Sequence, residues 1–347
     1  MKATFQKYIL NFKLPAGTSR GVLKTKDTYF LKIELEGKIG IGECSVFRGL
    51  SFDDTPDYEQ KLQWICDNIN LGQEVLLEAM KLYPSIQFGI EMAFLDLKAN
   101  KSMNLFPSKF TKGIDSIPIN GLIWMGDFSF MLEQIADKLD KNFTCIKMKI
   151  GAIDFESEIS LLKKIRNQFS VKDVELRVDA NGAFSKDNAL EKLKILSDFD
   201  IHSIEQPIKQ GHVEDMARLC ENTPLDIALD EELIGVIDIQ EKKKLLETIK
   251  PQYIILKPSL VGGIKGSIEW IELAEMNKSS WWITSALESN IGLNAIAQWT
   301  YTLQSSLPQG LGTGSLFTNN IASPLEVDEG KLFYNQDIDW GLSKIKL

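Results

Sequence analysis

Five ionisable residues recur at nearly even spacing along the chain, each at the end of a short apolar run. They are Lys149, Asp179, Glu205, Asp230 and Lys257, and neighbours in this series are 25 to 30 residues apart. That spacing suits one strand–helix repeat, and in a (β/α)8 barrel the carboxyl ends of the strands meet at one face, where catalytic residues gather. Each residue alone would be ordinary turn or helix-start chemistry. Their recurrence in this order predicts one shared site.

Strand alternation indicates which side chains point toward that site. Residues two apart on a strand point the same way, so Lys147 shares a face with Lys149, and Asn181 continues the face of Asp179. The residues between them are apolar or small: Ile146, Met148, Ile150, Val178 and Ala180. We therefore expect the charged face of each strand inside the barrel and the other face against the helices.

Three carboxylates that converge on one point repel one another unless a positive charge lies between them. Asp179, Glu205 and Asp230 offer only oxygen atoms, and a set without cysteine or histidine favours a hard cation, Mg²⁺ or Mn²⁺, over zinc. Such an ion would hold a substrate carboxylate and stabilise the charge that develops when its α-proton leaves. The sequence thus predicts a metal site at this face.

A general base must also be found, and few candidates exist. His202 is expected on the outward face of its strand and His212 in a loop or helix start, so both are expected to be structural. Lysine remains. Lys147 lies two residues from Lys149, and a like charge at that distance lowers the pKa of an amine toward a working value. Lys257 would approach the substrate from the opposite side of the metal.

The elements that position these residues fall into two parts. Residues 30–43 alternate apolar and polar side chains as a hairpin does, and residues 58–67 and 89–100 carry apolar residues at helical spacing, so the chain begins as a small α+β domain. Between about residues 110 and 320, short β-rich runs alternate with amphipathic stretches, which predicts βα units and a parallel sheet. The β-rich runs are 145–150, 174–179, 201–205, 225–230 and 253–257.

The polar, glycine-bearing segment 14–27 is predicted to be a loop. It could close over the site as a lid, although a plain surface loop fits the sequence equally well.

Composition restricts the partners. The 347 residues fit a barrel of about 250 residues with a smaller companion domain. A net charge of −9 and a pI near 5.0 argue against nucleic acid, and neither a signal peptide nor a membrane span is evident. Four cysteines without a CxxC pair indicate reduced thiols and a cytoplasmic protein. We expect a small-molecule carboxylate as the partner, with the oligomeric state left open.

The motifs resemble those of a known family, the muconate lactonising subgroup of the enolase superfamily, over nearly the whole chain. They are KMK at 147–149, DAN at 179–181, EQP at 205–207, DE at 230–231 and KP at 257–258. The resemblance implies an α/β fold, a modified TIM (β/α) barrel at 106–322 with an N-terminal α+β capping domain at 1–105. It also implies that a C-terminal segment, 323–347, returns to the cap.

Within that subgroup the chain is most similar to the o-succinylbenzoate synthase family. The similar segments are 42–51, 88–97, 119–126 and 285–297. The resemblance implies a carbon–oxygen lyase of menaquinone biosynthesis. Its reaction would be the dehydration of 2-succinyl-6-hydroxy-2,4-cyclohexadiene-1-carboxylate through an enediolate.

The same resemblance implies a role for each residue. Asp179, Glu205 and Asp230 would ligate Mg²⁺. Lys149 would remove the α-proton and later return a proton to the departing hydroxide, while Lys147 would tune Lys149 and contact the substrate carboxylate, and Lys257 would stabilise the intermediate as a cation. Candidates for the substrate pocket are Asn181, Ser285, Glu288, Ser289 and Arg20, and helix capping is an equal alternative for the serines.

Other activities remain open on the same scaffold. An N-succinyl or N-acyl amino acid racemase is the main alternative because two opposed lysines suit racemisation equally well, and muconate cycloisomerase is a third possibility. Acid-sugar dehydratases use a late histidine, and none follows His212; dipeptide epimerases carry an acidic pair where this chain reads LGTGS at 311–315. A barrel that binds metal and ligand without turnover represents a different class.

Overall fold

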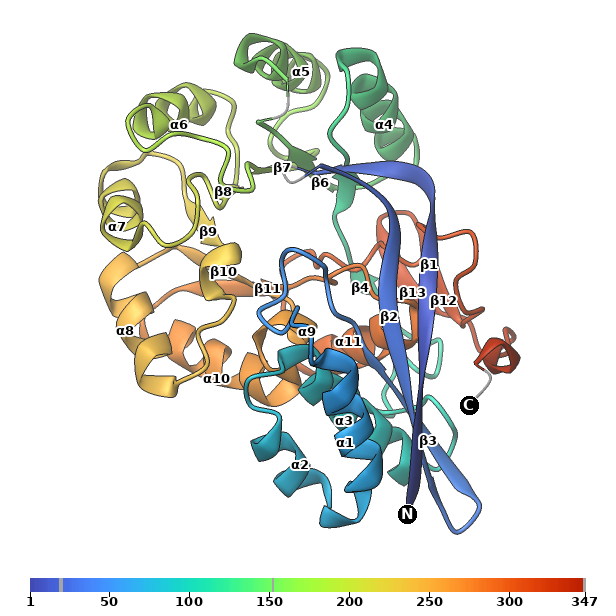
Figure 1. The fold of residues 1–347 in the computed structure, drawn as a ribbon. Helices are drawn as coiled ribbons and strands as arrows, with labels where there is room; N and C mark the ends of the chain where they lie inside the picture. Colours follow the sequence, from blue (N-terminus) through green and yellow to red (C-terminus); the bar gives the residue numbers. More distant parts are fainter. Residues whose placement is uncertain (19–20, 152, 346–347) are drawn as a thin grey trace.

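The computed structural model describes residues 1–18, 21–151 and 153–345. Figure 1 shows a curled sheet surrounded by helices, with a second group of strands and helices from the N-terminal part of the chain packed beside it. This arrangement confirms the predicted α/β class, a barrel-like sheet with an N-terminal α+β cap.

The curled sheet contains seven parallel strands in the described part of the chain, in the order β11-β10-β9-β8-β7-β6-β5. They are β5 (Gly121–Ile123), β6 (Cys145–Lys149), β7 (Glu175–Asp179), β8 (Ser203–Glu205), β9 (Ile227–Leu229), β10 (Tyr253–Leu256) and β11 (Ser280–Ile283). Isolated bridges of Ile119 with Gln309 and of Thr284 with Gly310 bring the two edges together. All five predicted β-rich runs are confirmed as strands.

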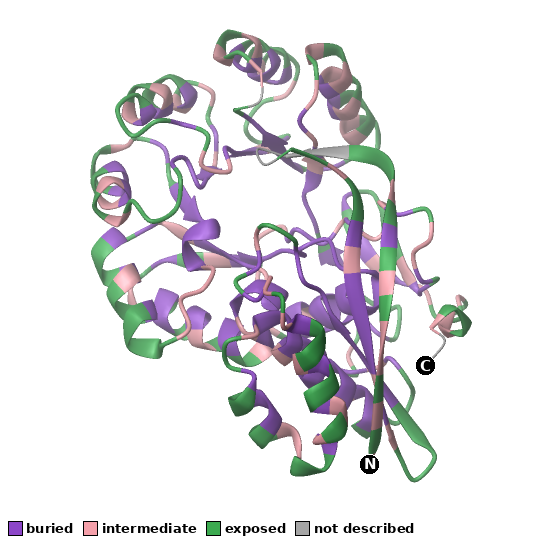
Figure 2. Ribbon diagram, in the orientation of Figure 1, coloured by how far each residue is buried: buried purple, intermediate pink, exposed green. Residues whose placement is uncertain are grey.

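Helices cover the outside of this sheet. They are α4 (Phe128–Asp140), α5 (Phe155–Gln168), α6 (Ala189–Ser197), α7 (Val213–Asn222), α8 (Ile239–Ile249), α9 (Pro258–Val261), α10 (Gly263–Met276) and α11 (Asn290–Thr302). In Figure 2 the outer helices are exposed on one side and buried on the other, as amphipathic helices on a sheet must be. Ile146, Met148 and Val178 join the core formed with these helices, so the predicted outward apolar face is confirmed.

In the part of the cap that the structure describes, three antiparallel strands combine with three α-helices. These are β1 (Lys2–Thr18), β2 (Gly21–Leu35), β3 (Lys38–Cys44), α1 (Tyr58–Asp67), α2 (Gln73–Ala79) and α3 (Pro84–Lys98). The turn between Leu35 and Lys38 confirms the predicted hairpin. Helix α3 lies directly on β3, because a Cβ at Gly42 would stand 2.0 Å from the carbonyl oxygen of Gly89.

The prediction of a loop at 14–27 is wrong. Strands β1 and β2 stay paired as far as Thr18 and Gly21, with one register shift between Asn11 and Ala16. Polar composition suggested a loop, but a two-stranded ribbon exposed on both faces needs no apolar alternation, and its backbone groups are satisfied across the pair. Arg20, the pocket candidate in this segment, lies outside the described residues.

The C-terminal segment contacts both parts. Strands β12 (Leu325–Asp328) and β13 (Lys331–Tyr334) form a hairpin that pairs with β4 (Ile117–Pro118), at the start of the barrel. Farther on, Trp340, Leu342 and Ile345 pack against a cluster that includes cap residues of β2 and β3.

Two buried carboxylates of the cap bind helix starts of the barrel. Glu91 of α3 accepts hydrogen bonds from the backbone N–H groups of Ile264 (2.6 Å) and Lys265 (3.0 Å) in the first turn of α10. Glu43 of β3 accepts from the N–H groups of Ser289 (2.9 Å) and Gly292 (2.8 Å) at the start of α11. Anions stabilise helix N-termini, so these contacts join the cap to the barrel.

The four cysteines, Cys44, Cys66, Cys145 and Cys220, are free thiols. Within the described ranges, each helix is too short or too polar to cross a membrane.

Candidate active site

The strand register brings the predicted ionisable residues to one end of the sheet. Lys149 is paired with Asp179 across β6 and β7, and Asp179 with Glu205 across β7 and β8. Asp230 and Lys257 follow β9 and β10 directly. The five predicted positions therefore stand at the carboxyl ends of neighbouring parallel strands, and all five side chains are buried or nearly so.

Lysine amines lie between the carboxylates. Lys147 Nζ is 2.7 Å from Glu205 Oε2 and 3.2 Å from Asp179 Oδ2. Lys149 Nζ donates to Asp179 Oδ2 at 2.9 Å and to Asn181 Oδ1 at 2.6 Å. Lys257 pairs with Asp230. The predicted convergence of two amines and three carboxylates is thus present, with Lys147 as a third amine.

Burial and neighbouring charge act in opposite directions on these groups. Burial raises the pKa of Glu205 well above its usual range, and the charge of Asp179 raises it further. Burial also acts to raise the pKa of Asp179, but Lys149 and Lys147 outweigh it and hold that pKa below its usual range. Burial lowers the pKa of Lys147, whereas Glu205 and Asp179 raise it, and the net shift is upward. The acids thus tighten the hold of Lys147 on its proton.

The oxygen atoms present suit a hard divalent cation in kind. Among the residues that the structure describes, no three acid, histidine or cysteine side chains are grouped closely enough to hold a metal ion as they stand, because the lysines occupy the space between the acids. Glu205 Oε1, however, is buried without a hydrogen-bond partner. A buried carboxylate oxygen without a hydrogen-bond partner is an oxygen ligand that Mg²⁺ could bind. The side chains therefore fit such an ion.

Left-handed turns after the strands orient a further layer of polar groups. Asn181 (φ 43°) follows β7 and Gln206 (φ 40°) follows β8. Asn181 Nδ2 donates to Glu231 Oε1 at 3.0 Å, and Gln206 Oε1 accepts from the backbone N–H of Asp230 at 3.2 Å. These hydrogen bonds hold the turns that carry the acids.

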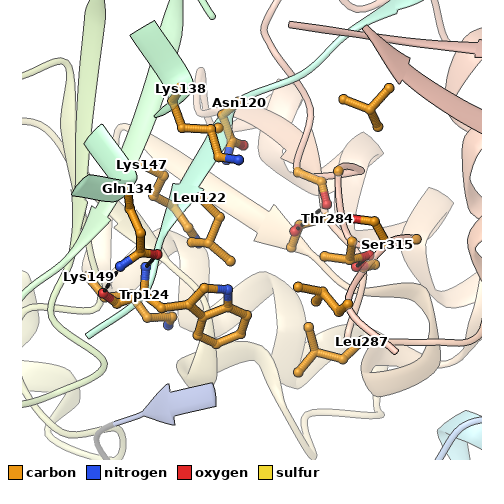
Figure 3. Close-up of a pocket in the computed structure, with 18 of the residues that line it drawn as sticks. Asn120, Leu122, Trp124, Gln134, Lys138, Lys147, Lys149, Thr284, Leu287 and Ser315 are labelled. Atoms are coloured by element: carbon orange, nitrogen blue, oxygen red, sulfur yellow. Dashed lines mark hydrogen bonds between the residues drawn. The ribbon is translucent and has the colours of Figure 1, made fainter. Parts of the chain in front are cut away.

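A cavity of about 670 Å³ opens above the ionisable cluster. Its lining includes Lys147, Lys149, Asp179, Asn181, Lys257 and Ser285. Figure 3 shows Lys147 and Lys149 on one side of this space and Thr284, Leu287 and Ser315 on the other. A volume of this size suits a small-molecule ligand.

The other pocket candidates lie behind the wall of the cavity. Glu288 accepts hydrogen bonds from Ser259 and from the backbone N–H of Ala286. Ser289 is the N-cap of α11, where its Oγ accepts from Ile291 and donates to Glu43 at 2.6 Å. The capping alternative therefore holds for Ser289, and of the two candidate serines it is Ser285 that borders the cavity.

Several lining residues were missed in the sequence analysis. Trp124 and Gln134 line the barrel side, and Phe47 and Leu50 reach in from the cap. Gln134 holds Trp124 in place by accepting from its backbone N–H at 2.9 Å and donating to its carbonyl oxygen at 3.1 Å. For Phe47, Leu50 and Trp124 the available signal was their position in the segments 42–51 and 119–126, which carried the family resemblance, whereas Gln134 lies outside both segments.

Neither histidine belongs to the cluster. The ring of His202 lies 4.8 Å from that of Tyr253 and 6.3 Å from that of Trp282, at the end of β8 opposite Glu205. The predicted outward position of His202 is therefore wrong, because the residue precedes the strand and turns toward the aromatic rings inside. His212, next to the start of α7, is largely exposed.

Comparisons with known proteins agree with this geometry. A family model described as enolase C-terminal domain-like matches residues 131–342. The o-succinylbenzoate synthase of Desulfotalea psychrophila is 46% identical over an alignment that covers 96% of this chain and 98% of that protein. The o-succinylbenzoate synthase of Bacillus subtilis is 24% identical and covers 95% of this chain and 90% of its own length.

Solved structures extend the likeness to three dimensions. The crystal structure of MenC from Desulfotalea psychrophila has a TM-score of 0.86 and 42% identity, covering 96% of this chain and 99% of that one. A dipeptide epimerase from Enterococcus faecalis, solved with Mg and the dipeptide L-Leu-L-Tyr, has a TM-score of 0.81 at 21% identity, covering 98% of each chain, and so shares the fold. The chain belongs to the enolase superfamily.

Proposed function

We propose that the chain catalyses the o-succinylbenzoate synthase reaction, the loss of water from 2-succinyl-6-hydroxy-2,4-cyclohexadiene-1-carboxylate. It would thus act as a carbon–oxygen lyase in menaquinone biosynthesis. The observation that carries the proposal is the near-full-length relative of that name at 46% identity, in a chain whose own strands bring Lys149 and Lys257 to one set of acids.

We further propose that Asp179, Glu205 and Asp230 hold Mg²⁺, with Mn²⁺ as an alternative. When bound, the ion would supply positive charge for the carboxylate of the substrate as its α-proton leaves. The partnerless oxygen of Glu205 supports this assignment. Because Lys147 and Lys257 now neutralise the same acids, a cation must compete with their amines.

Lys149 is the proposed base. Its amine, once neutral, would take the α-proton of the substrate, and the hydrogen bond from Lys149 Nζ to Asn181 Oδ1 fixes where that amine points. The C–O bond then breaks, and Lys149 would return the proton to the departing hydroxide, which leaves as water. One base can serve both steps when the proton and the hydroxyl group leave from the same side of the ring.

The other lysines have electrostatic roles in this proposal. Glu205 and Asp179 raise the pKa of Lys147, so Lys147 would contact the substrate carboxylate as a cation. Burial lowers the pKa of Lys257, but Asp230 and Glu205 raise it on balance. Lys257 would therefore remain a cation that faces the ring and stabilises the charge left by proton removal.

The proposed division of the chain is a cap at 1–105, a barrel at 106–322 and a terminal segment at 323–347. A separate apolar core of β2, β3 and α1–α3 residues supports the first boundary. The hairpin β12–β13 pairs with β4 and then leads to cap contacts, which supports the third part.

An N-succinyl or N-acyl amino acid racemase is the second candidate. The observation that favours it is the separation of the two amines, because Lys149 and Lys257 follow strands with three others between them. Two bases on different sides of one carbon could remove a proton from either enantiomer.

One experiment separates these functions. The purified chain with Mg²⁺ is given the cyclohexadiene substrate, and formation of o-succinylbenzoate is followed by absorbance; in parallel, N-succinyl amino acids in D₂O are followed by NMR for exchange at Cα. We expect dehydration at a catalytic rate. Exchange without dehydration would establish the racemase instead, and binding of o-succinylbenzoate with neither reaction would indicate a non-catalytic barrel.

A further inference from the structure

The barrel wall contains a seam beside β5. Backbone hydrogen bonds join Asn120 N to Gln309 O at 3.0 Å and Gln309 N to Pro118 O at 2.8 Å. Past that point, within the described ranges, β5 pairs only with β6, and no backbone hydrogen bond links it to residues 310–316. The two edges of the sheet therefore separate where the cavity begins.

The cavity extends through this seam. Besides the inner residues Lys147 and Lys149, its lining includes Lys138, Phe143 and Val327, which come from α4, the start of β6 and the terminal hairpin. The stem of Lys138 lies along the outer face of β5 at Gly121, where an added Cβ would stand 3.0 Å from its Cγ and Cδ atoms. Glycine at that position lets the lysine reach the cavity from outside the sheet.

The Asn120 amide and the Lys138 side chain both border the cavity at the seam, and no hydrogen bond joins them among the described residues. Asn120 is 5% exposed and lines the cavity, and among the described residues no side-chain hydrogen bond to another part of the protein is found for its amide. Figure 3 shows the side chains of Asn120 and Lys138 directed toward the same part of the cavity. A ligand or water in the cavity can therefore hydrogen-bond to this amide.

The charge of Lys138 is only partly compensated. Its Nζ lies 3.2 Å from Asp137 Oδ2, but Asp137 Oδ1 also binds Lys141 Nζ at 2.6 Å. One carboxylate thus serves two amines. Glu133 borders the cavity one turn earlier on α4, and no ion pair joins it to Lys138 among the described residues. Lys138 can therefore accept a further anion.

The hydroxyl groups of Thr284, Ser285 and Thr313 near the seam already have partners, and Ser315 is a further hydroxyl in the cavity lining. Thr284 Oγ1 donates to the carbonyl oxygen of Gly310 at 2.9 Å, and Ser285 and Thr313 are hydrogen-bonded to each other at 2.6 Å. Much of the remaining lining there is apolar: Leu122, Leu316, Leu325, Val327 and Leu332. A carboxylate entering this space must find a cation and an N–H donor, since burying it alone is expensive.

We propose that Asn120 and Lys138 form a subsite for a carboxylate carried at the end of a flexible chain, such as the succinyl chain of the substrate. The inference rests on the proposed function, because it assumes that the ring carboxylate is bound at the lysine–acid cluster. The substrate then has one carboxylate left, and the seam provides the ammonium and amide groups that bind it, with an apolar channel for the methylene carbons.

Binding of two probe ligands to matched variants tests the subsite. Isothermal titration with o-succinylbenzoate and with benzoate, which lacks the chain, is compared for wild type, Lys138→Met, Lys138→Arg and Lys172→Met, all with Mg²⁺ present. We expect Lys138→Met to weaken o-succinylbenzoate about fivefold, as suits a partly exposed ion pair, and to leave benzoate unchanged. Lys138→Arg should restore most of the loss. Lys172, an exposed lysine away from the cavity lining, is the matched control, and Lys172→Met should change neither ligand.

Kinetics give a second readout. Because the chain carboxylate is remote from the reacting carbon, Lys138→Met should raise KM with kcat unchanged. Equal affinity of Lys138→Met and wild type for o-succinylbenzoate would overturn the subsite, as would an equal loss for benzoate. In both cases wild-type turnover would leave the proposed function standing. A wild type that neither binds o-succinylbenzoate nor dehydrates the substrate would overturn both.

Discussion

The two ends of the barrel interior are built from the same strands but filled differently. At the carboxyl ends, three amines and three acids form a cluster whose members Lys147, Lys149, Lys257 and Asp179 line a cavity, and Glu205 Oε1 has no partner. At the opposite end, the Arg177 guanidinium lies 4.3 Å from the ring of Trp282 and donates to Glu175 at 2.7 Å and to Pro308 O at 2.9 Å. At one end the ionisable side chains border an open cavity, and at the other end large side chains fill the interior.

The two ends should therefore matter for different properties of the protein. Trp282 is 1% exposed and packs with Ala228 and Ile255 into a small core inside the sheet. Such a plug has no room for a ligand, so its residues should affect folding. The charged end should affect turnover and leave folding nearly unchanged, because its charges already neutralise one another.

Removal of metal should give the largest effect, and only at the charged end. We expect EDTA to lower dehydration by about 10³-fold or more and added Mg²⁺ to restore it, since a metal ion contributes several kcal/mol at a developing negative charge. The lysine ion pairs neutralise the acids without metal. The midpoint of thermal unfolding should therefore shift little in EDTA. Full turnover in EDTA would remove the metal from the mechanism.

Loss of the base should come next. Lys149→Ala is expected to lower kcat by roughly 10²–10⁴-fold, the contribution of a positioned general base. Asp179 keeps Lys147 at 3.2 Å and, with Mg²⁺ bound, would gain a second cation, so with Mg²⁺ present the free energy of unfolding should change by only about 1 kcal/mol. Dehydration rates and urea unfolding check both statements. A variant that retains a tenth of wild-type kcat would contradict the assignment.

The plug should behave in the reverse way, and neighbouring tryptophans provide the control. Trp282→Ala is expected to cost about 3–5 kcal/mol of stability while the variant that remains folded keeps kcat near wild type. Trp281 is less buried and donates to Glu275 at 3.3 Å, so Trp281→Ala should cost about 1 kcal/mol or less. Urea denaturation measures both. Equal losses of unfolding free energy in the two variants would mean that the position inside the sheet contributes no more to stability than the neighbouring position.

The smallest effect concerns pH at the plugged end. Burial lowers the pKa of His202 below its usual range. As pH falls below the pKa of His202 in the unfolded chain, the unfolded chain binds a proton while folded His202 stays neutral. The free energy of unfolding therefore declines with falling pH, and the loss is complete below the pKa of His202 in the folded chain. His202→Gln should make the unfolding free energy less dependent on pH in this window. An unchanged slope in the variant would assign the effect to another group.

Period and alternation were enough to predict the charged end. Lys149, Asp179 and Glu205 stand at strand ends because a βα repeat has a nearly fixed length, and alternation turns them inward. The pairing of each acid with a lysine was not predicted, since spacing cannot tell whether a carboxylate faces a metal or an amine. That choice depends on side-chain positions across three strands.

The remaining differences come from contacts between distant segments. Segment 14–27 lacks apolar alternation, so only its pairing within the β1–β2 ribbon defines it as strand. Phe47 and Leu50 border the cavity because the cap packs on the barrel, and Asn120 and Lys138 both border it where β5, among the described residues, has no strand partner on one side. None of these contacts follows from local sequence, since each joins elements that are far apart in the chain or depends on a missing neighbour.

The contacts of Glu43 and Glu91 with the first turns of α11 and α10 have a consequence for chimeras that combine the cap of one relative with the barrel of another. Each carboxylate satisfies two main-chain donors of the barrel, so a chimera whose cap lacks acids at these two positions would leave four backbone N–H groups without these partners. Phe47 and Leu50, which line the cavity from the cap, can therefore be transplanted with full stability only together with those two acids.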